Sequence, residues 1–370
     1  MPGTFTIDTV VSLLDKYPFS PAGATVISLL LWNKARQLSA YELTFGQWLK
    51  DTASARTKAY LAWVFLKTLN RVVVRLIINR GWKRDRPAWT SGKEVIVITG
   101  GAGGIGGALV DLLSKKTNKV AVLDLGPPTY KARNVNYYKC DVSSEKQVAE
   151  VAKQIRSDLG HPTILINNAG IARGETIMNL SAQQFMKTYK VNTLAAFIII
   201  KEFIPHIIKT NHGHIMTVAS SASYASIPQL SEYACSKSAV LSLHEVLSSE
   251  LIHRYNAPRV RTSVICPTKV QTNMGQAMED HPSQFWTPVL TPQEVAKEMF
   301  ALIDSGLSGH KVMPLYASLI LPSIRALPEW HRFVVNTAGK THETITDKRN
   351  ASIMEDYRKK LAEQDENKDD

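Results

Sequence analysis

A phenol and an ammonium group stand one helical turn apart in Tyr233-Ala-Cys-Ser-Lys237. Residues at i and i+4 share a helix face, so we expect the two side chains to be neighbours. A nearby ammonium favours the phenolate and lowers the pKa of a tyrosine from its usual value of about 10. The pair therefore predicts an acid/base group that works near neutral pH. Taken alone, however, Tyr-x-x-x-Lys more often marks a solvated helix face.

A glycine-rich turn stands between a strand pattern and a helix pattern. Residues 95–99 run into Gly100-Gly-Ala-Gly-Gly-Ile-Gly106, and a helix pattern follows over 108–114. Glycines allow a tight turn and a close approach to a pyrophosphate, which then lies against the free N–H groups of the helix. A glycine run alone is equally consistent with a flexible loop, but its setting here predicts nucleotide binding. The expected contacts are Gly100, Gly103, Gly104, Ile105 and Gly106.

An acidic residue ends the next strand pattern. Asp124 follows Val120-Ala-Val-Leu, about 20 residues beyond the glycine loop, where a carboxylate accepts hydrogen bonds from an adenosine ribose. A 2′-phosphate would meet like charge there, and neither the glycine loop nor the residues immediately after Asp124 include Arg or Lys. We therefore expect NAD rather than NADP. The alternative is an Asp that caps the next turn.

The elements that must position these groups alternate between short β-branched runs and longer helical patterns. Such alternation is typical of an α/β protein with a Rossmann-type, doubly wound parallel sheet covered by helices on both faces. The expected strands are 94–99, 119–124, 135–139, 163–167, 214–219 and 261–266.

The order of these motifs from about 94 to 310 resembles the short-chain dehydrogenase/reductase family. It is similar in particular to the membrane- and lipid-droplet-associated retinol and 17-beta-hydroxysteroid dehydrogenase branch. The motifs are Thr99-Gly-x-x-x-Gly-Ile-Gly106, Asp141-Val142, Asn167-Asn-Ala-Gly170, Asn192, Ser220, Tyr233-x-x-x-Lys237, and Pro267 with Thr272. The resemblance implies hydride transfer between the nicotinamide and a substrate carbon, with the protein supplying orientation and proton transfer.

The resemblance also assigns catalytic roles. It makes Tyr233 the acid/base, while Lys237 lowers its pKa and holds the nicotinamide ribose. Ser220 orients the substrate oxygen, and Asn192 supports a water relay, so Ser220 and Tyr233 are the expected substrate contacts. Ser220 is preferred to Ser221 because the family's serine lies thirteen residues before its tyrosine.

Further cofactor contacts follow from the resemblance. They are Asp141, Val142, Asn168, Ala169, Gly170, Tyr233, Lys237, Pro267, Val270 and Thr272. One departure is visible, because the family usually has Pro-Gly after the sixth strand and this chain has Pro267-Thr268. The conformation of that loop is therefore an open question. No His, Cys, Asp or Glu cluster has metal-ligand spacing, so no metal is expected.

The N-terminal part differs in composition from the rest. Of the formal net charge of +12, residues 1–93 carry 14 Lys and Arg against 5 Asp and Glu, together with five of the seven Trp. Basic, aromatic and apolar residues together favour a membrane surface over nucleic acid. In 59–82, Lys67, Arg71 and Arg75 form a cationic stripe, which is typical of an interfacial helix with snorkelling side chains. The alternative is a helix packed on the catalytic domain or on a second subunit.

The expected organisation therefore has five parts. A helical membrane-associating extension (1–82) and a linker (83–93) precede the catalytic domain (94–311), which is followed by an apolar, proline-rich segment (312–339) and a charged tail (340–370). The apolar segment is either a second membrane contact or a flap on the core. Whether 17–33 spans, re-enters or lies on the membrane is left open, since prolines leave it shorter than the about 20 apolar residues a span needs.

The expected activity is NAD-dependent interconversion of a lipophilic alcohol, such as a retinoid, steroid or long-chain lipid alcohol, and its carbonyl. Apolar side chains in 275–292, where the family places its substrate lid, suit such a substrate, although they would equally suit a neighbouring subunit. We expect a homodimer at the endoplasmic reticulum membrane or a lipid droplet, facing the cytosol. The alternatives are an NADPH-type carbonyl reductase of lipid or secondary metabolism, and a catalytically silent scaffold on a lipid surface.

Overall fold

The computed structural model describes residues 6–38, 44–81, 83–276, 284–285, 287–328 and 330. The chain divides into two compact units, Met1–Lys83 and Arg84–Asp370. The expected tail 340–370 lies outside the described residues, as do 331–339 of the proline-rich segment and Met278 and Trp286 of the expected lid.

The larger unit is built on a seven-stranded parallel sheet with the order β3-β2-β1-β4-β5-β6-β7. The strands are β1 (Ile96–Thr99), β2 (Val120–Asp124), β3 (Asn136–Lys139), β4 (Ile164–Asn167), β5 (His214–Val218), β6 (Arg261–Pro267) and β7 (Gly309–Met313). The chain reverses direction across the sheet between β1 and β4, and ligands of such sheets bind beyond the carboxyl ends of the strands at this point. The doubly wound fold is therefore confirmed.

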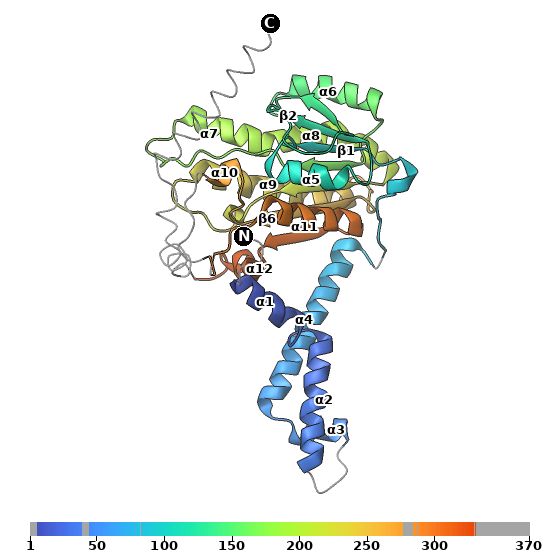
Figure 1. Ribbon diagram of the computed structural model, residues 1–370, viewed down its shortest axis with the longest axis vertical. Coiled ribbons are helices and arrows are strands. Elements are labelled where there is room, and N and C mark those ends of the chain that lie inside the picture. Colours follow the sequence, from blue (N-terminus) through green and yellow to red (C-terminus); the bar gives the residue numbers. More distant parts are fainter. Residues whose placement is uncertain are drawn as a thin grey trace. The chain divides into compact units, whose positions relative to one another are not determined.

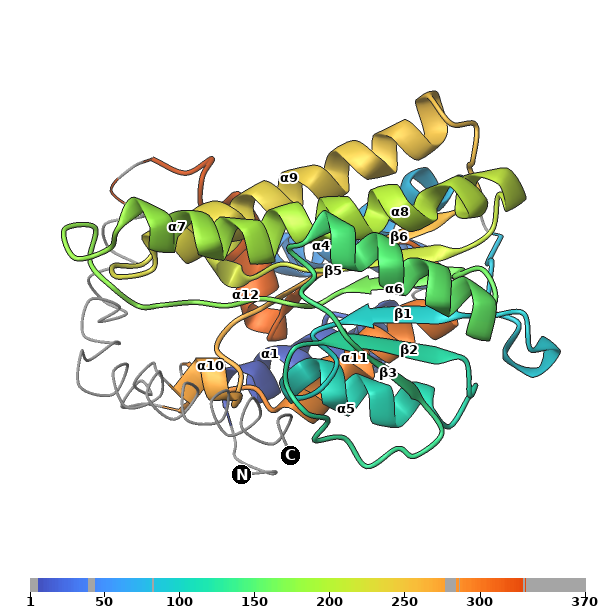
Figure 2. The same cartoon turned by 90° about the horizontal axis from the view of Figure 1, so that it is seen from above.

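Two helical layers cover this sheet (Figure 2). The layer with α6 (Glu145–Asp158), α8 (Ala195–Thr210) and α9 (Ser231–His253) packs on alternate residues such as Val95 and Val97. The opposite layer, with α5 (Gly104–Leu113) and α11 (Pro292–Ser305), packs on Ile96 and Ile98. Each strand of the sheet's centre is buried on both faces, which explains its continuous apolar sequence. Smaller elements are α7 (Ala182–Tyr189), η3 (Lys190–Leu194), η4 (Ser221–Ser223), α10 (Asn273–Gln276), α12 (Leu315–Ile320) and η5 (Leu321–Ser323).

The seventh strand was not expected from the sequence. β7 contains Gly309-His-Lys-Val-Met313, of which only Val312 and Met313 are buried. An edge strand buries little of its surface, so its sequence carries a weak apolar signal. The expected boundary at 311 falls inside this strand.

The segment from Asp85 to Trp89, before β1, packs within the larger unit. The N–H of Asp85 donates to Gly306 O at 2.9 Å, and the Asp85 carboxylate accepts from Arg259 and Arg261. Gly306 has a φ of +65°, and a Cβ there would lie 2.4 Å from Arg86 N. Trp89, in η2 (Trp89–Ser91), donates from its indole to Asp304 at 2.8 Å. Residues from Asp85 onward, expected as a linker, are thus part of the packed unit.

The smaller unit consists of helices: α1 (Ile7–Lys16), α2 (Pro21–Leu38), α3 (Phe45–Gln47), η1 (Trp48–Thr52) and α4 (Ala55–Asn79). α2 and α4 lie side by side (Figure 1). Many of their apolar side chains are exposed, with Leu30 at 64%, Phe65 at 65% and Ile77 at 70%.

Two cations of the stripe on α4 form ion pairs within the smaller unit, whereas the sequence predicted that they would snorkel to a membrane surface. Lys67 and Arg71 both form ion pairs with Asp15 of α1. The Lys67 ammonium also donates to Phe19 O at 3.2 Å. These two cations therefore join helices within the unit, because Asp15 supplies a partly buried carboxylate within their reach.

A helix that is long and apolar enough to cross a membrane runs from Ala182 to Thr210, through α7, η3 and α8. Half of its apolar window is buried, and α8 packs on the sheet through Ile198 and Ile199. Core helices of globular domains meet the same test. Among the described helices no other meets it, so α2 and α4 do not.

Candidate active site

The glycine loop joins β1 to the N-terminus of α5. Gly100 has a φ of +64°, and a Cβ there would lie 2.7 Å from Ala169 Cα. A Cβ on Gly106 would lie 2.2 Å from Gly100 O. The Asn168 carboxamide donates to Gly100 O at 2.8 Å and thereby fixes the turn. The N-cap of α5 is Gly103, which provides no side-chain cap, so the first N–H groups of the helix remain available to an anion.

Asp124 lies at the carboxyl end of β2, beside this loop. One carboxylate oxygen accepts from Ala102 N at 2.9 Å, and the other accepts from Leu125 N at 2.7 Å and Gly126 N at 3.1 Å. Backbone groups therefore hold a negative charge directly against the glycine loop. Asp124 caps its own turn, as the alternative interpretation expected, and its proximity to the glycine loop is compatible with the predicted contact to a ribose.

The loop after β6 adopts a conformation that does not need the family's glycine. Thr268 has a negative φ, which any residue can adopt, and its N–H donates to Met313 O at 2.9 Å. Val270 then forms a bridge with Leu290, and Thr272 lies against Gly104, 3.3 Å from a Cβ placed there. The fold thus brings Thr272 to the glycine loop.

The other predicted cofactor residues lie along the same sheet edge. Ala169 N and Asn168 N donate to Thr99 Oγ1 at 3.1 Å. The Asp141 carboxylate accepts from Ser143, while Val142 is 7% exposed and belongs to the core. Asp141 and Val142 therefore shape the loop after β3 from within.

Asn192, Ser220, Tyr233 and Lys237 come together from three elements. Asn192 lies in the π-helical turn η3, and its carboxamide exchanges hydrogen bonds with the backbone of Ile171 at 2.8 and 2.9 Å. It also donates to Ser236 Oγ of α9 at 2.9 Å. A π turn inserts a residue into a helix, often at functional sites, and here it aims the amide at the loop after β4.

Ser220 follows β5 and faces Tyr233 of α9. Its Oγ accepts from Ala222 N at 3.1 Å, which leaves its hydroxyl hydrogen available, and it forms a hydrogen bond with Tyr233. The Lys237 ammonium donates to Val218 O at 2.8 Å and lies 5.7 Å from the centre of the Tyr233 ring. A Cβ on Gly170 would lie 3.4 Å from both Lys237 Nζ and Asn192 Oδ1.

Burial is the largest influence on the pKa values of Tyr233 and Lys237. Burial raises the pKa of Tyr233 above 10, the Ser220 hydrogen bond opposes this rise, and Cys266 and Glu232 add to it. Burial lowers the pKa of Lys237 to about 8. The prediction that Tyr233 has a lowered pKa is therefore wrong for this arrangement. Burial destabilises the charged phenolate by more than the neighbouring groups stabilise it.

Sequence reasoning missed the side chains that hold this cluster. Glu232 is fully buried beside Tyr233, and its carboxylate accepts from Arg173 N in the loop after β4 at 2.8 Å. Ser236 connects α9 to Asn192, as described above. The acid before Tyr-x-x-x-Lys and the hydroxyl within it were visible in the sequence, but nothing in their spacing indicates their partners.

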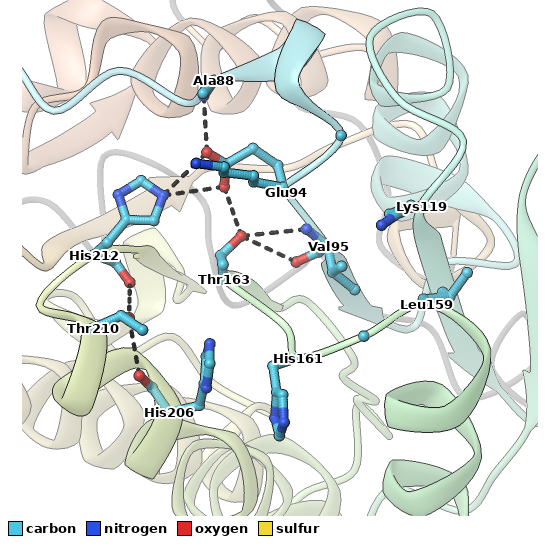
Figure 3. A pocket seen from close by; sticks show the side chains of 13 residues that line it. Ala88, Glu94, Val95, Lys119, Leu159, His161, Thr163, His206, Thr210 and His212 are labelled. Carbon is cyan, nitrogen blue, oxygen red and sulfur yellow. Dashed lines mark hydrogen bonds and ion pairs between the residues drawn. The ribbon is translucent and has the colours of Figure 1, made fainter.

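A separate hollow lies at the amino ends of β1, β4 and β5, away from these residues (Figure 3). Glu94, whose side chain is 1% exposed, accepts there from Ala88 N at 2.8 Å and Thr163 Oγ1 at 2.6 Å, and it pairs with His212 at 3.1 Å. Burial alone would raise the pKa of Glu94, but these hydrogen bonds hold it below its usual 4.5. The hydrogen bond to Glu94 raises the pKa of His212 above its usual 6.5, against its burial.

This pair gives stability a defined pH dependence. The lowered pKa of Glu94 stabilises the folded protein fully above pH 4.5, the usual value of the carboxyl group. The raised pKa of His212 stabilises it fully below pH 6.5, the usual value of the imidazole. Glu94→Gln should therefore lower the melting temperature most between these values, and less above 6.5, where His212 loses its proton as pH passes through its raised pKa. Thermal melts of both proteins at pH 5.5 and 8.5 test this. A difference that is larger at the higher pH would contradict it.

A glycine loop against a helix N-terminus, at the switch point of a parallel sheet, together with a Ser-Tyr-Lys cluster, defines the class of NAD(P)-dependent alcohol dehydrogenases and carbonyl reductases. Comparison with known proteins agrees. The pattern of the family described as short chain dehydrogenase matches residues 94–283. The chain therefore belongs to the short-chain dehydrogenase family.

Two relatives and one solved structure show what the chain is similar to. Dehydrogenase RED2 of Cochliobolus heterostrophus is 38% identical over 203 residues, 54% of this chain and 76% of that protein. Human estradiol 17-beta-dehydrogenase 11 is 32% identical over 247 residues, 64% of this chain and 80% of its own length. A 3-ketoacyl-(acyl-carrier-protein) reductase from Brucella melitensis, solved with NADH, shares the fold with a TM-score of 0.52 at 21% identity, covering 60% of this chain and 96% of its own.

Proposed function

We propose that this enzyme is an NAD-preferring dehydrogenase that interconverts a lipophilic alcohol and its carbonyl, with Tyr233 as the acid/base. The observation that carries the proposal is the convergence of Ser220, Tyr233 and Lys237 at the carboxyl edge of the sheet, beside the glycine loop. The lipophilic substrate is inferred from the hydroxysteroid dehydrogenases among the relatives.

The residues present fit a dinucleotide. The uncapped start of α5 offers N–H groups for a pyrophosphate, and Gly100, Gly103 and Gly106 leave the backbone accessible. Gly170 keeps the space beside the Lys237 ammonium free of a side chain, as a ribose there requires. When bound, NAD supplies nicotinamide C4 as the acceptor of a hydride.

The protein's own part in the reaction is orientation and proton transfer. The Ser220 hydroxyl donates a hydrogen bond to the substrate oxygen, and Tyr233 Oη accepts the alcohol proton during oxidation and returns it during reduction. Lys237, with a pKa of about 8, stabilises the phenolate while it is charged. Asn192 holds the loop after β4 through its two hydrogen bonds with Ile171, and the family resemblance gives it the support of a water relay.

The position of Asp124 supports the preference for NAD, because a fixed carboxylate disfavours a 2′-phosphate. Asp124→Ser should shift the ratio of kcat/KM for NADP over that for NAD upward by about 10-fold or more. Steady-state kinetics with both cofactors measure this ratio. Asp111→Ser, on α5, is the matched control, since the Asp111 carboxylate accepts from the backbone N–H groups of residues 131 and 132. An unchanged ratio in the Asp124 variant would refute the assignment.

We further propose that the smaller unit attaches the enzyme to an endoplasmic reticulum or lipid-droplet surface, with the larger unit facing the cytosol. The exposure of the large apolar side chains of Leu30, Phe65 and Ile77 supports this, because exposed apolar surface marks interaction sites. The net positive charge of residues 1–93 would add attraction to anionic headgroups. Attachment along the surface is favoured over spanning, since neither α2 nor α4 is sufficiently apolar.

A flotation experiment tests this attachment. The full chain should float with vesicles of phosphatidylcholine and phosphatidylserine, and the triple variant Leu30→Glu, Phe65→Glu, Ile77→Glu should remain in the dense fraction. Ile177→Glu with Met178→Glu removes exposed apolar groups from the larger unit instead and serves as the control. If the triple variant floats as well as wild type, the smaller unit is not the anchor.

Self-association is proposed through the outer face of α8 and α9. Phe197 on α8 is 47% exposed and Val246 on α9 is 53% exposed, and the two helices pack against each other. Such apolar side chains on adjacent helices suit an isologous interface between two copies.

Two alternatives remain distinguishable by experiment. An NADPH-linked carbonyl reductase would give the reverse cofactor ratio in the kinetics above. A silent scaffold would bind NAD, seen by titration of protein fluorescence, yet reduce no NAD with retinoid, steroid or long-chain alcohols. Formation of NADH with any of them would exclude the scaffold.

A further inference from the structure

The turn that carries Ser220 is held from outside by a residue near the end of the described chain. η4 runs from Ser221 to Ser223 with Tyr224 as its C-cap, and the last carbonyl groups of such a turn have no partner within it. Two of them accept from the guanidinium of Arg325: Ser223 O from Nη2 at 3.0 Å and Tyr224 O from Nε at 3.1 Å. Nη2 also lies 3.4 Å from Ser238 Oγ.

Packing of the chain around it explains why Arg325 reaches this position. Ile324 is 1% exposed, and Ala317 of α12 is buried in the same apolar cluster as Ala219 and Cys266. The segment is thus anchored next to the residue that precedes Ser220. A planar guanidinium with donors in a fixed fork can bind two carbonyls at once, which an ammonium cannot do in the same geometry.

The two carbonyls belong to a turn that is already joined to the catalytic helix. Ser223 Oγ donates to Lys237 O at 2.7 Å, and Ser238 Oγ donates to Ser223 O at 3.1 Å. Ser223 N in turn donates to Ser220 O at 3.0 Å. A shift of Ser223 would therefore move Ser220 relative to α9.

Tyr224 is fixed at its other end as well. Its hydroxyl forms a hydrogen bond with His310 of β7 and lies 3.8 Å from Cys266 Sγ, whose thiol contacts the backbone of Ser220. The turn is consequently clamped between Arg325 on one side and β6 and β7 on the other.

We propose that Arg325 is a positioning residue for the oxidoreductase reaction: by closing the end of η4, it fixes Ser220 against Tyr233. This inference rests on the proposed roles of Ser220 and Tyr233. Arg325 touches neither substrate nor cofactor in this account, so its loss should affect the chemical step and spare cofactor binding.

The test compares wild type with Arg325→Ala and Arg325→Lys. We expect kcat to fall about 10-fold in Arg325→Ala, since small misplacements of reacting groups cost up to about 10²-fold, with the KM for NAD unchanged. Arg325→Lys should be intermediate, and millimolar guanidinium should restore part of the activity of Arg325→Ala alone. Arg156→Ala, which removes a partly exposed arginine of α6 that pairs with Glu202 of α8, is the matched control.

A second readout does not need turnover. Because the Ser220 hydrogen bond opposes the rise in the Tyr233 pKa, Arg325→Ala should move the ultraviolet phenolate titration of Tyr233 to higher pH, with Tyr233→Phe identifying the signal. Unchanged kcat and unchanged titration in a folded Arg325→Ala protein would overturn the proposal. If wild type turns over no alcohol, the proposed function fails, and the titration still decides whether Arg325 positions Ser220. If Arg325→Ala does not fold, kcat and the phenolate titration of Arg325→Lys test the proposal instead.

Discussion

Tyr233→Phe is expected to reduce kcat by about 10²- to 10⁴-fold, the range that general acid–base catalysis contributes. The substitution removes only the hydroxyl that exchanges a proton with the substrate, and it leaves the ring packed beside Lys237. The Kd for NAD should stay within about 2-fold, because the glycine loop and Asp124 lie on other elements. NADH absorbance and fluorescence titration measure the two quantities.

The control for this variant is Tyr255→Phe, which removes a surface hydroxyl bonded to Glu250. It should retain wild-type kcat. A Tyr233→Phe enzyme that keeps more than about a tenth of wild-type kcat would mean that another group transfers the proton.

Asp85→Asn is expected to destabilise the larger unit by about 3–5 kcal/mol, since breaking a buried ion pair leaves an uncompensated charge. The side chains of Asp85 and Arg261 are each 4% exposed, and they join the start of the larger unit to the first residue of β6. Urea unfolding followed by circular dichroism gives the free energy of unfolding.

The second partner of Asp85 provides the comparison. The Arg259 side chain is 54% exposed, so Arg259→Ala should cost only about 0–1 kcal/mol. Equal effects of the two substitutions, or an effect of Asp85→Asn below about 1 kcal/mol, would show that the buried pair does not fasten this segment.

The sequence predicted the central sheet well because its strands are apolar on both faces. Ile96, Val97 and Ile98 alternate between the two cores, so the strand reads as continuous apolar residues whichever helix layer is considered. The glycine loop was predictable for a different reason, because close backbone contacts there exclude any Cβ. In both cases a local physical requirement is written into local sequence.

Features that depend on distant residues could not be predicted. β7 buries only Val312 and Met313 at the sheet edge, and the Arg325 contacts cross about a hundred residues of chain. Lys67 and Arg71 formed a clear cationic stripe, but their partner Asp15 lies 52 and 56 residues earlier. The pKa of Tyr233 was mispredicted because the sequence shows its cation and not its burial.

Transfer of isotopic hydrogen tests the central claim most directly. Purified enzyme would be incubated with NAD and retinoid, steroid and long-chain alcohols that carry deuterium on the carbinol carbon, and the reduced cofactor would be analysed by mass spectrometry. We predict deuterated NADH from at least one substrate class with wild type, and formation of it about 10²- to 10⁴-fold more slowly with Tyr233→Phe. Absence of deuterium in the cofactor from every substrate, with NAD shown to be bound, would contradict the account.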